Sequence, residues 1–482
     1  MNITIDILSN KKILLILITI FIYSCSYKQD RNKTTISTTI TESSNNLTKP
    51  GTPKIKYSNP TINIYIENSG SMDGYVRGNT KYKDAVTNLL VDLKHFYGEE
   101  KIKIHFICDN IYKSNDSFSV NFAYQLAPNS IDWRQGNRGS TSLNNIVRMV
   151  LENTHKDDIS ILISDCIYSL RGQDTEGLLT QQKSLTKDAF LSKLKEFELI
   201  CTIIKLHSEF TGSYWDKNDN SETISNKIRP YYIWIIGNQK SMDDFNSKIQ
   251  FKEFTEYQNS YIITKTDTTV KPYYTVLSCS YNKGRFKPIR DLSCSKYIHG
   301  IEGIDFSERD NNTFRFAVAV DLSKIPVEND YLTNKSNYNI TGNYQIESIE
   351  KINKKNLCPF DKNMVGSATA TYVITFSVKS KAIDDLTFEL KKQIPKWVFD
   401  SDTIDDTNIN QCLDKTFGFK YLIEGVEQAY STISEGENTF LKISIPIKKT
   451  TESSFGKGFL IFLIIVILGG IIFFVIRKLK NN

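Results

Sequence analysis

Five short apolar runs in the first half of the chain alternate with stretches whose apolar residues recur every three or four positions. The runs are Ile62–Ile66, Ile102–Cys108, Ile159–Ser164, Leu199–Leu206 and Tyr231–Ile236. The helix-like positions are Tyr82, Val86, Leu89, Leu90, Leu93 and Phe96, then Leu143, Ile146, Val147, Val150 and Leu151. Strands alternating with amphipathic helices are typical of a parallel sheet covered on both faces. The pattern predicts a doubly wound, mostly parallel α/β sheet of the Rossmann-like type over residues 55–255.

Beyond residue 255 the pattern changes to strict alternation, which is typical of strands with one buried face. It is clearest at Phe314, Phe316, Val318 and Val320, at Tyr372, Ile374, Phe376 and Val378, and at Leu441, Ile443, Ile445 and Ile447. We therefore predict a β-sandwich-like region, with one β-rich module at 256–352 and a second at 366–450. Asn353–Ser367 is the predicted break, and Pro446 is expected at a strand edge or bulge.

The N-terminus has the features of an export signal. Lys11 and Lys12 precede the apolar stretch Ile13–Tyr23, which is too short to span a bilayer but suits a signal-peptide core. The stretch runs into Ile22-Tyr23-Ser24-Cys25, which resembles a bacterial lipobox. We expect residues 1–25 to be a lipoprotein-type signal peptide with Cys25 lipidated; an ordinary cleaved signal and an uncleaved anchor are the alternatives. Residues 26–54, rich in Ser, Thr, Asn and Lys, are expected to be a disordered tether.

The C-terminus carries a candidate membrane span. Gly458–Ile476 contains no charge, and nineteen residues form a helix of about 28 Å, enough to cross a bilayer. Arg477, Lys478 and Lys480 follow, so the positive-inside rule places residues 477–482 in the cytoplasm. The bulk of the chain is then expected on the extracytoplasmic side.

The formal net charge of +6 comes mostly from these two termini, and the part between them is nearly neutral. Binding to nucleic acid calls for a strong basic surplus. Composition therefore predicts no nucleic-acid partner.

Candidate chemistry lies at the ends of two predicted strands. Glu67-Asn68-Ser69-Gly70-Ser71 follows the first apolar run, Thr141 opens a predicted helix, and Asp165 follows the run that ends at Ser164. Ser-Gly-Ser alone is often only a turn or helix cap. Together, however, these residues offer hydroxyl and carboxylate oxygens, the ligands that Mg²⁺ prefers.

In order and type these segments resemble the metal-ion-dependent adhesion site of von Willebrand factor A (VWFA) domains. The resemblance implies that Glu67, Ser69, Ser71, Thr141 and Asp165 hold Mg²⁺, or Mn²⁺ or Ca²⁺, and that the metal accepts a carboxylate from a protein partner. This chain departs from the family pattern at Glu67, where the family has Asp, and at Cys166, where many members have Gly.

We therefore expect a binding function rather than catalysis, in a membrane-anchored protein of the bacterial cell envelope. Two alternatives remain. Glu67 could crowd or disable the metal site and leave a structural envelope scaffold. A metal-dependent hydrolase is the other, but no general base accompanies the ligands.

The remaining cysteines are assigned by position. Cys108, Cys166 and Cys201 lie on or beside predicted strands, where a buried free thiol is expected. Cys279 with Cys294, and Cys358 with Cys412, are candidate disulfides, which an exported protein allows. Spacing alone does not decide either pair.

Overall fold

The computed structural model describes one compact unit of the chain. The described residues are 60–114, 122–139, 142–170, 172, 174–265, 272–290, 297–306, 312–366, 369–379, 383–436 and 438–448, with 466–467, 469–470, 477 and 479. The predicted signal peptide with Cys25, the predicted tether, Thr141 and most of Gly458–Ile476 lie outside them.

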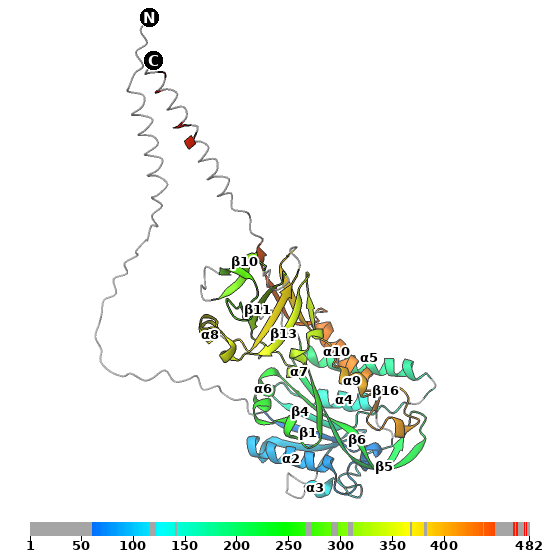
Figure 1. Cartoon of the computed structure of the whole chain (residues 1–482). Helices are drawn as coiled ribbons and strands as arrows, with labels where there is room; N and C mark the ends of the chain where they lie inside the picture. The colour runs from blue at the N-terminus through cyan, green and yellow to red at the C-terminus, as the bar shows by residue number, and fades with distance from the viewer. Residues whose placement is uncertain are drawn as a thin grey trace, which may run out of the picture. The chain divides into compact units, whose positions relative to one another are not determined.

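A seven-stranded sheet forms the centre of the first half of this unit (Figure 1). Its order is β3 (Ile111–Lys113), β2 (Ile102–Ile107), β1 (Ile62–Glu67), β4 (Ile159–Ser164), β6 (Ser221–Gly237), β5 (Ile200–Trp215) and β7 (Tyr257–Ile263). All five predicted strands are present. The predicted α/β class is confirmed.

The prediction of a mostly parallel sheet is wrong. Only β2, β1 and β4 pair in parallel, while β3, β6, β5 and β7 each pair antiparallel to a neighbour. The physical reason lies in the connection from β5 to β6. Residues 216–220 make a tight turn, and a parallel connection needs a crossover of about a dozen residues or more. The two strands therefore form a hairpin, and β6 rather than β5 lies beside β4.

Helices cover both faces of this sheet, so its central strands β1 and β4 are buried at every position. On one face α2 (Lys81–Tyr97) and α6 (Gln239–Lys248) share a core with Ile64 and Ile161. On the other, α4 (Leu143–Glu152) and α5 (Thr175–Leu194) pack with Tyr65 and Leu162. Shorter helices are η1 (Gly70–Gly74), η2 (Glu99–Lys101), α3 (Phe122–Gln125) and η3 (Phe251–Glu253).

The second half of the unit contains three small sheets that share one hydrophobic core. They are β13 (Gln345–Lys351), β14 (Tyr372–Val378), β11 (Phe314–Val320) and β8 (Tyr274–Val276); β12 (Tyr338–Ile340), β15 (Leu386–Lys391) and β18 (Thr439–Ile445); and β19 (Ile447–Lys448), β10 (Ile298–Asp305) and β9 (Arg285–Arg290). Pro446 separates β18 from β19, each at a sheet edge, in agreement with the expectation for a proline.

The two predicted β-rich modules share one sheet, because β14 lies between β11 and β13 and pairs with both. The helices α7 (Asn329–Thr333), η5 (Lys335–Asn337), η6 (Lys354–Asn356) and α8 (Pro359–Gly366) connect these strands. The predicted break at Asn353–Ser367 is therefore a connection within one sheet. Strand pairing between segments distant in sequence leaves no local signal in the pattern of apolar residues.

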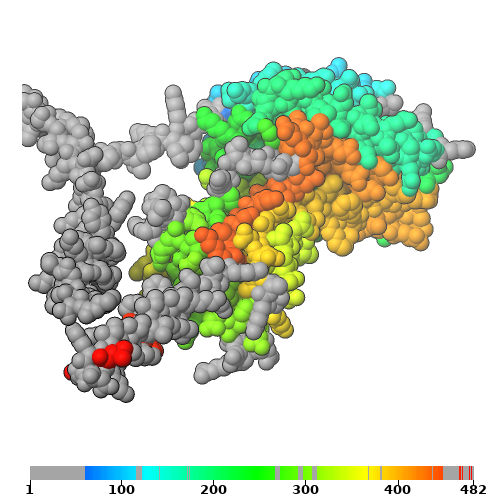
Figure 2. Space-filling model, turned by 90° about the horizontal axis from the view of Figure 1, so that it is seen from above, coloured from blue at the N-terminus to red at the C-terminus, as the bar shows by residue number. Residues whose placement is uncertain are grey.

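The chain also returns to the first sheet. Strand β7 extends that sheet past residue 255, the predicted domain boundary. Helix α10 (Phe419–Ile433), together with α9 (Lys396–Asp400), β16 (Asp402–Thr403), η7 (Ile409–Gln411) and β17 (Thr416–Phe417), lies in a segment predicted to be β-rich. Leu422 and Val426 of α10 pack in the core of α4 and α5, and the orange surface of α10 borders the turquoise surface of α5 in Figure 2.

Within the described residues, no helix is long and apolar enough to cross a membrane. Of the predicted span Gly458–Ile476, only residues 466–467 and 469–470 are described. The span therefore remains a prediction from the sequence.

Candidate functional site

Two carboxylates meet at one edge of the first sheet. Glu67 is the last residue of β1, and Asp165 directly follows β4. These strands are parallel neighbours with Ile66 opposite Ile163, so their carboxyl ends lie together. This is the edge at which ligands bind in open α/β sheets.

Both carboxylates are almost completely buried, with 5 % of Glu67 and 1 % of Asp165 exposed. Burial, then the neighbouring charge of Asp165, raises the pKa of Glu67 to about 8. Burial also raises the pKa of Asp165. Two buried carboxylates this close favour a proton or a cation between them.

The hydroxyls of the motif lie at the same place. Ser69 and Ser71 flank the start of η1, and their Oγ atoms are 2.9 Å apart. Ser71 lies close enough to Asp165 for its hydroxyl to oppose the rise in the pKa of that carboxyl. Thr141 is outside the described residues, but Gly139 lines the same cavity as the two serines. The structure thus brings together four of the five predicted ligands.

Ser164 is a residue of this site that the sequence motif did not include. Its hydroxyl donates to Oε2 of Glu67 and accepts the backbone N–H of Cys166 at 2.8 Å. Cys166 has a φ of 57°, the left-handed conformation that glycine adopts most readily. The sequence could have indicated Ser164, because it is the polar residue that ends the mostly apolar strand β4.

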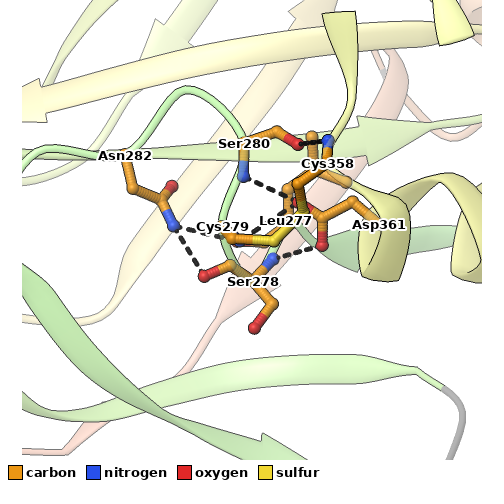
Figure 3. Close-up of a disulfide and its surroundings, with 7 residues drawn as sticks. All are labelled: Leu277, Ser278, Cys279, Ser280, Asn282, Cys358 and Asp361. Atoms are coloured by element: carbon orange, nitrogen blue, oxygen red, sulfur yellow. Dashed lines mark hydrogen bonds between the residues drawn. A yellow bond between two sulfur atoms is a disulfide. The ribbon is translucent and has the colours of Figure 1, made fainter. Parts of the chain in front are cut away.

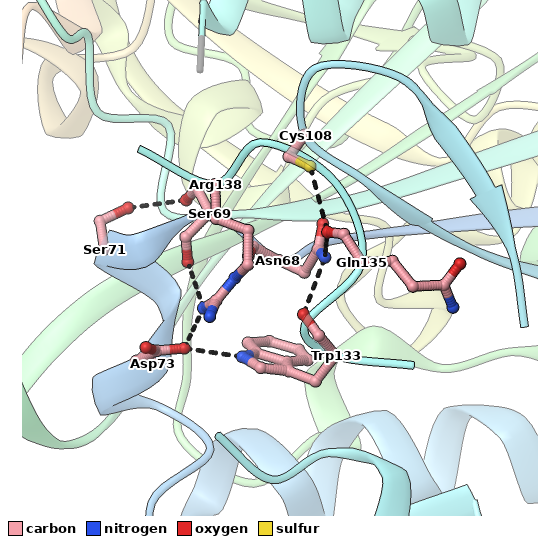
Figure 4. Close-up of polar contacts among 8 residues, drawn as sticks. All are labelled: Asn68, Ser69, Ser71, Asp73, Cys108, Trp133, Gln135 and Arg138. Carbon is pink, nitrogen blue, oxygen red and sulfur yellow. Dashed lines mark hydrogen bonds and ion pairs between the residues drawn. The ribbon is translucent and has the colours of Figure 1, made fainter. Parts of the chain in front are cut away.

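Arg138 contacts the loop that carries Ser69 and Ser71 (Figure 4). Its guanidinium donates to the carbonyls of Asn68 and Ser69 and pairs with Asp73. Trp133 Nε1 also donates to Asp73, at 2.7 Å. The Arg138 carbonyl in turn accepts the N–H of Gly70 at 3.0 Å.

Asn68 fixes the other end of the same loop. Its side-chain amide donates to the carbonyls of Trp133 and Gln135, at 2.8 and 2.9 Å (Figure 4). Its backbone N–H donates to Ile107 in the neighbouring strand, at 3.1 Å. The loop that carries Ser69 and Ser71 is therefore held in one conformation by the protein itself.

A cavity of about 390 Å³ opens beside this loop. It is lined by motif residues and by the turn of the β5–β6 hairpin: Glu67, Ser69, Gly70, Ser71, Arg138, Gly139, Ile167, Tyr168, Ser169, Leu170, Tyr214, Trp215, Asp216 and Asp219. Asp165 does not line it. The cavity gives a ligand access to the hydroxyl side of the site.

The hairpin reaches the site because β5 and β6 extend beyond their neighbours. From His207 to Trp215 the strand β5 pairs with β6 alone. Asp406 anchors the end of the hairpin by accepting the hydroxyl of Tyr214 and the backbone N–H of Lys217. The apolar runs of the sequence did not indicate this extension, because this part of β5 alternates polar and apolar residues without a strongly apolar run.

The predicted disulfide pairs are wrong. Cys279 is bonded to Cys358, with Cα atoms 6.3 Å apart (Figure 3). Cys412 is a buried free thiol, and Cys294 is outside the described residues. The tertiary fold determines this pairing: Cys358, just before α8, lies next to Cys279 in the loop that follows β8. Cys108, Cys166 and Cys201 are buried free thiols, as predicted.

The buried carboxylate of Asp361 lies next to this disulfide and accepts the backbone N–H groups of Ser278, Cys279 and Ser280 (Figure 3). With Cys279 and Cys358 it makes the one group of three metal-ligating side chains of the His, Cys, Asp and Glu types within the described part of the chain. The two sulfur atoms are bonded to each other, so this group is structural rather than a second metal centre.

The oxygen atoms that this candidate site offers suit a hard divalent cation. Asp165 Oδ2 is buried and has no hydrogen-bond partner among the described residues. A buried carboxylate oxygen without a partner is costly, and a cation held with Glu67, Ser69 and Ser71 would remove that cost. No family model, no curated protein and no solved structure matches this chain.

Proposed function

We propose that this chain is a VWFA-like binding protein of the cell envelope, which uses a divalent cation to bind an acidic group of a protein partner. Glu67 and Asp165 would hold the cation directly or through water, and the hydroxyls of Ser69, Ser71 and Thr141 would complete the site. Mg²⁺ is the first candidate, with Mn²⁺ and Ca²⁺ as alternatives. When bound, the metal supplies a positive charge with an open coordination position.

The observation that carries the proposal is the partnerless Oδ2 of Asp165 beside the buried Glu67. A site built only for structure would fill such a position with a hydrogen-bond donor, because an unsatisfied buried acceptor destabilises the fold. Here the neighbouring donors are hydroxyls, which can turn their lone pairs toward a cation.

The proposed partner and location rest on further features. The cavity on the serine side is wide enough for a carboxylate side chain, and Ile167, Leu170 and Trp215 give it apolar walls. The signal peptide with Cys25 and the apolar stretch Gly458–Ile476 support attachment to a membrane, with the bulk of the chain on its extracytoplasmic side.

Thermal unfolding of the full-length chain in a non-ionic detergent tests this function. The measurement is made with EDTA, with Mg²⁺ and with Mn²⁺, at a pH above 8, because burial raises the pKa of Glu67 to about 8 and ligands bind metal deprotonated. A cation that binds only the native state raises Tm with its concentration. Ser71→Ala should lose this rise, whereas Ser184→Ala, an exposed hydroxyl on α5, should keep it.

Absence of a metal-dependent shift in the wild type would contradict the proposal and favour an envelope scaffold. Equal shifts in wild type and Ser71→Ala would place the cation elsewhere. A shift accompanied by hydrolysis of a generic ester or phosphoester would favour the metal-dependent hydrolase.

A further inference from the structure

Arg229, on β6, is a buried cation whose nitrogens make no hydrogen bond of good geometry, although the hydroxyl of Tyr75 lies beside it. Only 1 % of its surface is exposed, and none of its three guanidinium nitrogens bonds a described residue with good geometry. Its Cζ lies 4.5 Å from the ring centroid of Tyr214 and 6.0 Å from that of Phe210. Aromatic faces attract a cation, but they do not satisfy its N–H groups.

Tyr214 links this cation to the candidate metal site. Tyr214 lines the cavity with Glu67 and Ser71, and its ring stacks on the guanidinium. Tyr75, which follows η1, donates its hydroxyl to the carbonyl of Pro230, next to Arg229 in the chain. Burial raises the pKa of Asp165, and the positive charge of Arg229 opposes that rise. Arg229 therefore acts electrostatically on the carboxylate at the metal site.

A purely structural role does not account for the charge. A buried ion with such poor hydrogen bonding is more costly than an apolar side chain of similar size. Lys205 on the adjacent strand offers the contrast. It is also buried, but its Nζ donates to Ser401 at 2.7 Å and to the Asp414 carbonyl at 3.3 Å.

The charge has a clear effect on a metal site. Among the buried groups, Glu67 and Asp165 together neutralise a divalent cation, and Arg229 then leaves one positive charge in excess. That excess opposes binding of the metal alone and favours simultaneous binding of an anion, since charges interact strongly where water is excluded.

We propose that Arg229 couples the two ligands of the site, so that the divalent cation binds more tightly together with the carboxylate of the partner than it does alone. The inference rests on the proposed metal-dependent function. It adds that the site binds the metal–carboxylate pair more tightly than the metal alone.

Calorimetric titration of Mg²⁺ into the full-length chain in detergent tests this coupling, with sodium acetate or sodium chloride at matched ionic strength. In the wild type, acetate should tighten Mg²⁺ binding at least about fivefold, the lower end of usual coupling between two ligands. Arg229→Met should bind Mg²⁺ more tightly in chloride and lose the effect of acetate. Arg229→Lys, which keeps the charge, should retain it, and Lys205→Met, which removes a buried cation elsewhere, should behave like the wild type.

The outcomes separate this inference from the proposed function. Mg²⁺ binding in the wild type that is equally tight in acetate and chloride would overturn the coupling and leave metal binding intact. The same holds if Arg229→Met, shown by circular dichroism to be folded, keeps the effect of acetate. Absence of Mg²⁺ binding under both conditions would overturn both proposals. The wild-type comparison needs no substitution, so it decides the question even if Arg229→Met does not fold.

Discussion

Phe210 occupies the space into which a side chain at Gly74 would project. A Cβ built at Gly74 would overlap the Phe210 ring, and a Cβ built at Gly212 would come within 3.0 Å of the Gly74 Cα. The β5–β6 hairpin is thereby packed directly on η1. This contact ties the wall of the cavity to the loop that carries Ser69 and Ser71.

Gly74→Ala should therefore destabilise the protein by about 1–3 kcal/mol, the usual cost of overpacking a rigid core. It should also weaken Mg²⁺ binding, because η1 must move away from the hairpin. Chemical denaturation and calorimetry measure the two effects. The matched control is Gly366→Ala, at the end of α8, where an added Cβ meets no atom within 4 Å. Equal stability of the two variants would contradict the close packing.

Ser164 orients the Glu67 carboxylate by donating a hydrogen bond to its Oε2. Partners that orient a metal ligand are typically worth about 10–100-fold in metal affinity. We expect a loss of this size in Ser164→Ala. We also expect it in Glu67→Asp, since the shorter side chain withdraws the carboxylate from Ser164.

Calorimetric titration with Mg²⁺ measures both effects. Ser160→Ala removes a buried hydroxyl from the same strand, one bonded to Thr154 at 2.7 Å, and should leave Mg²⁺ affinity unchanged. If Glu67→Asp instead binds Mg²⁺ more tightly, Glu67 weakens the site compared with the family's Asp.

The positions of Glu67 and Asp165 could be predicted because they follow from local patterns. Runs such as Ile62–Ile66 are buried on both faces, and a polar residue after such a run lies at a strand end. Parallel neighbours then bring their carboxyl ends together. The same reasoning located α2 and α4 from their apolar spacing.

Pairing between distant segments could not be predicted in this way. Nothing near Arg229 indicates that its strand lies between β4 and β5, or that Tyr214 will stack on its side chain. Cys279 and Cys358 are 79 residues apart, and they meet only because the fold places α8 beside the loop after β8. The sequence pattern records which face of an element is buried, not what it is buried against.

The Cys279–Cys358 bond closes a long loop, which gives it a large expected effect on stability. With a sequence separation of 79, the chain-entropy model gives about 4.5 kcal/mol. The double variant Cys279→Ser/Cys358→Ser should lose stability of this order, measured by urea unfolding without reductant. With reductant, the wild type should lose a similar amount and the variant should not change.

Peptide mapping under non-reducing conditions checks the pairing itself. A cross-linked peptide containing Cys279 and Cys358 is the expected product. A peptide that joins Cys279 to Cys294, or Cys358 to Cys412, would contradict it. Cys412→Ser is the control, since this thiol is free and its loss should not alter the response to reductant.

His207, on β5, should make stability depend on pH. Burial, then the nearby charge of Lys205, lowers its pKa from 6.5 to about 4. Its Nε2 is buried and has no hydrogen-bond partner among the described residues, so the folded state favours the neutral ring. Between pH 4 and 6.5 the unfolded chain binds the proton more readily. Stability is then complete above pH 6.5 and is lost as pH falls toward 4.

The loss assigned to His207 is at most about 3 kcal/mol, from the size of the shift. Carboxyl groups titrate in the same range, so His207→Gln serves to isolate the contribution of the histidine. The free energy of unfolding of the wild type and His207→Gln should converge as pH falls below 6.5, because only the wild type has this group to protonate. Parallel curves across the range would show that the ring at position 207 accepts a proton equally well in the folded and unfolded chain.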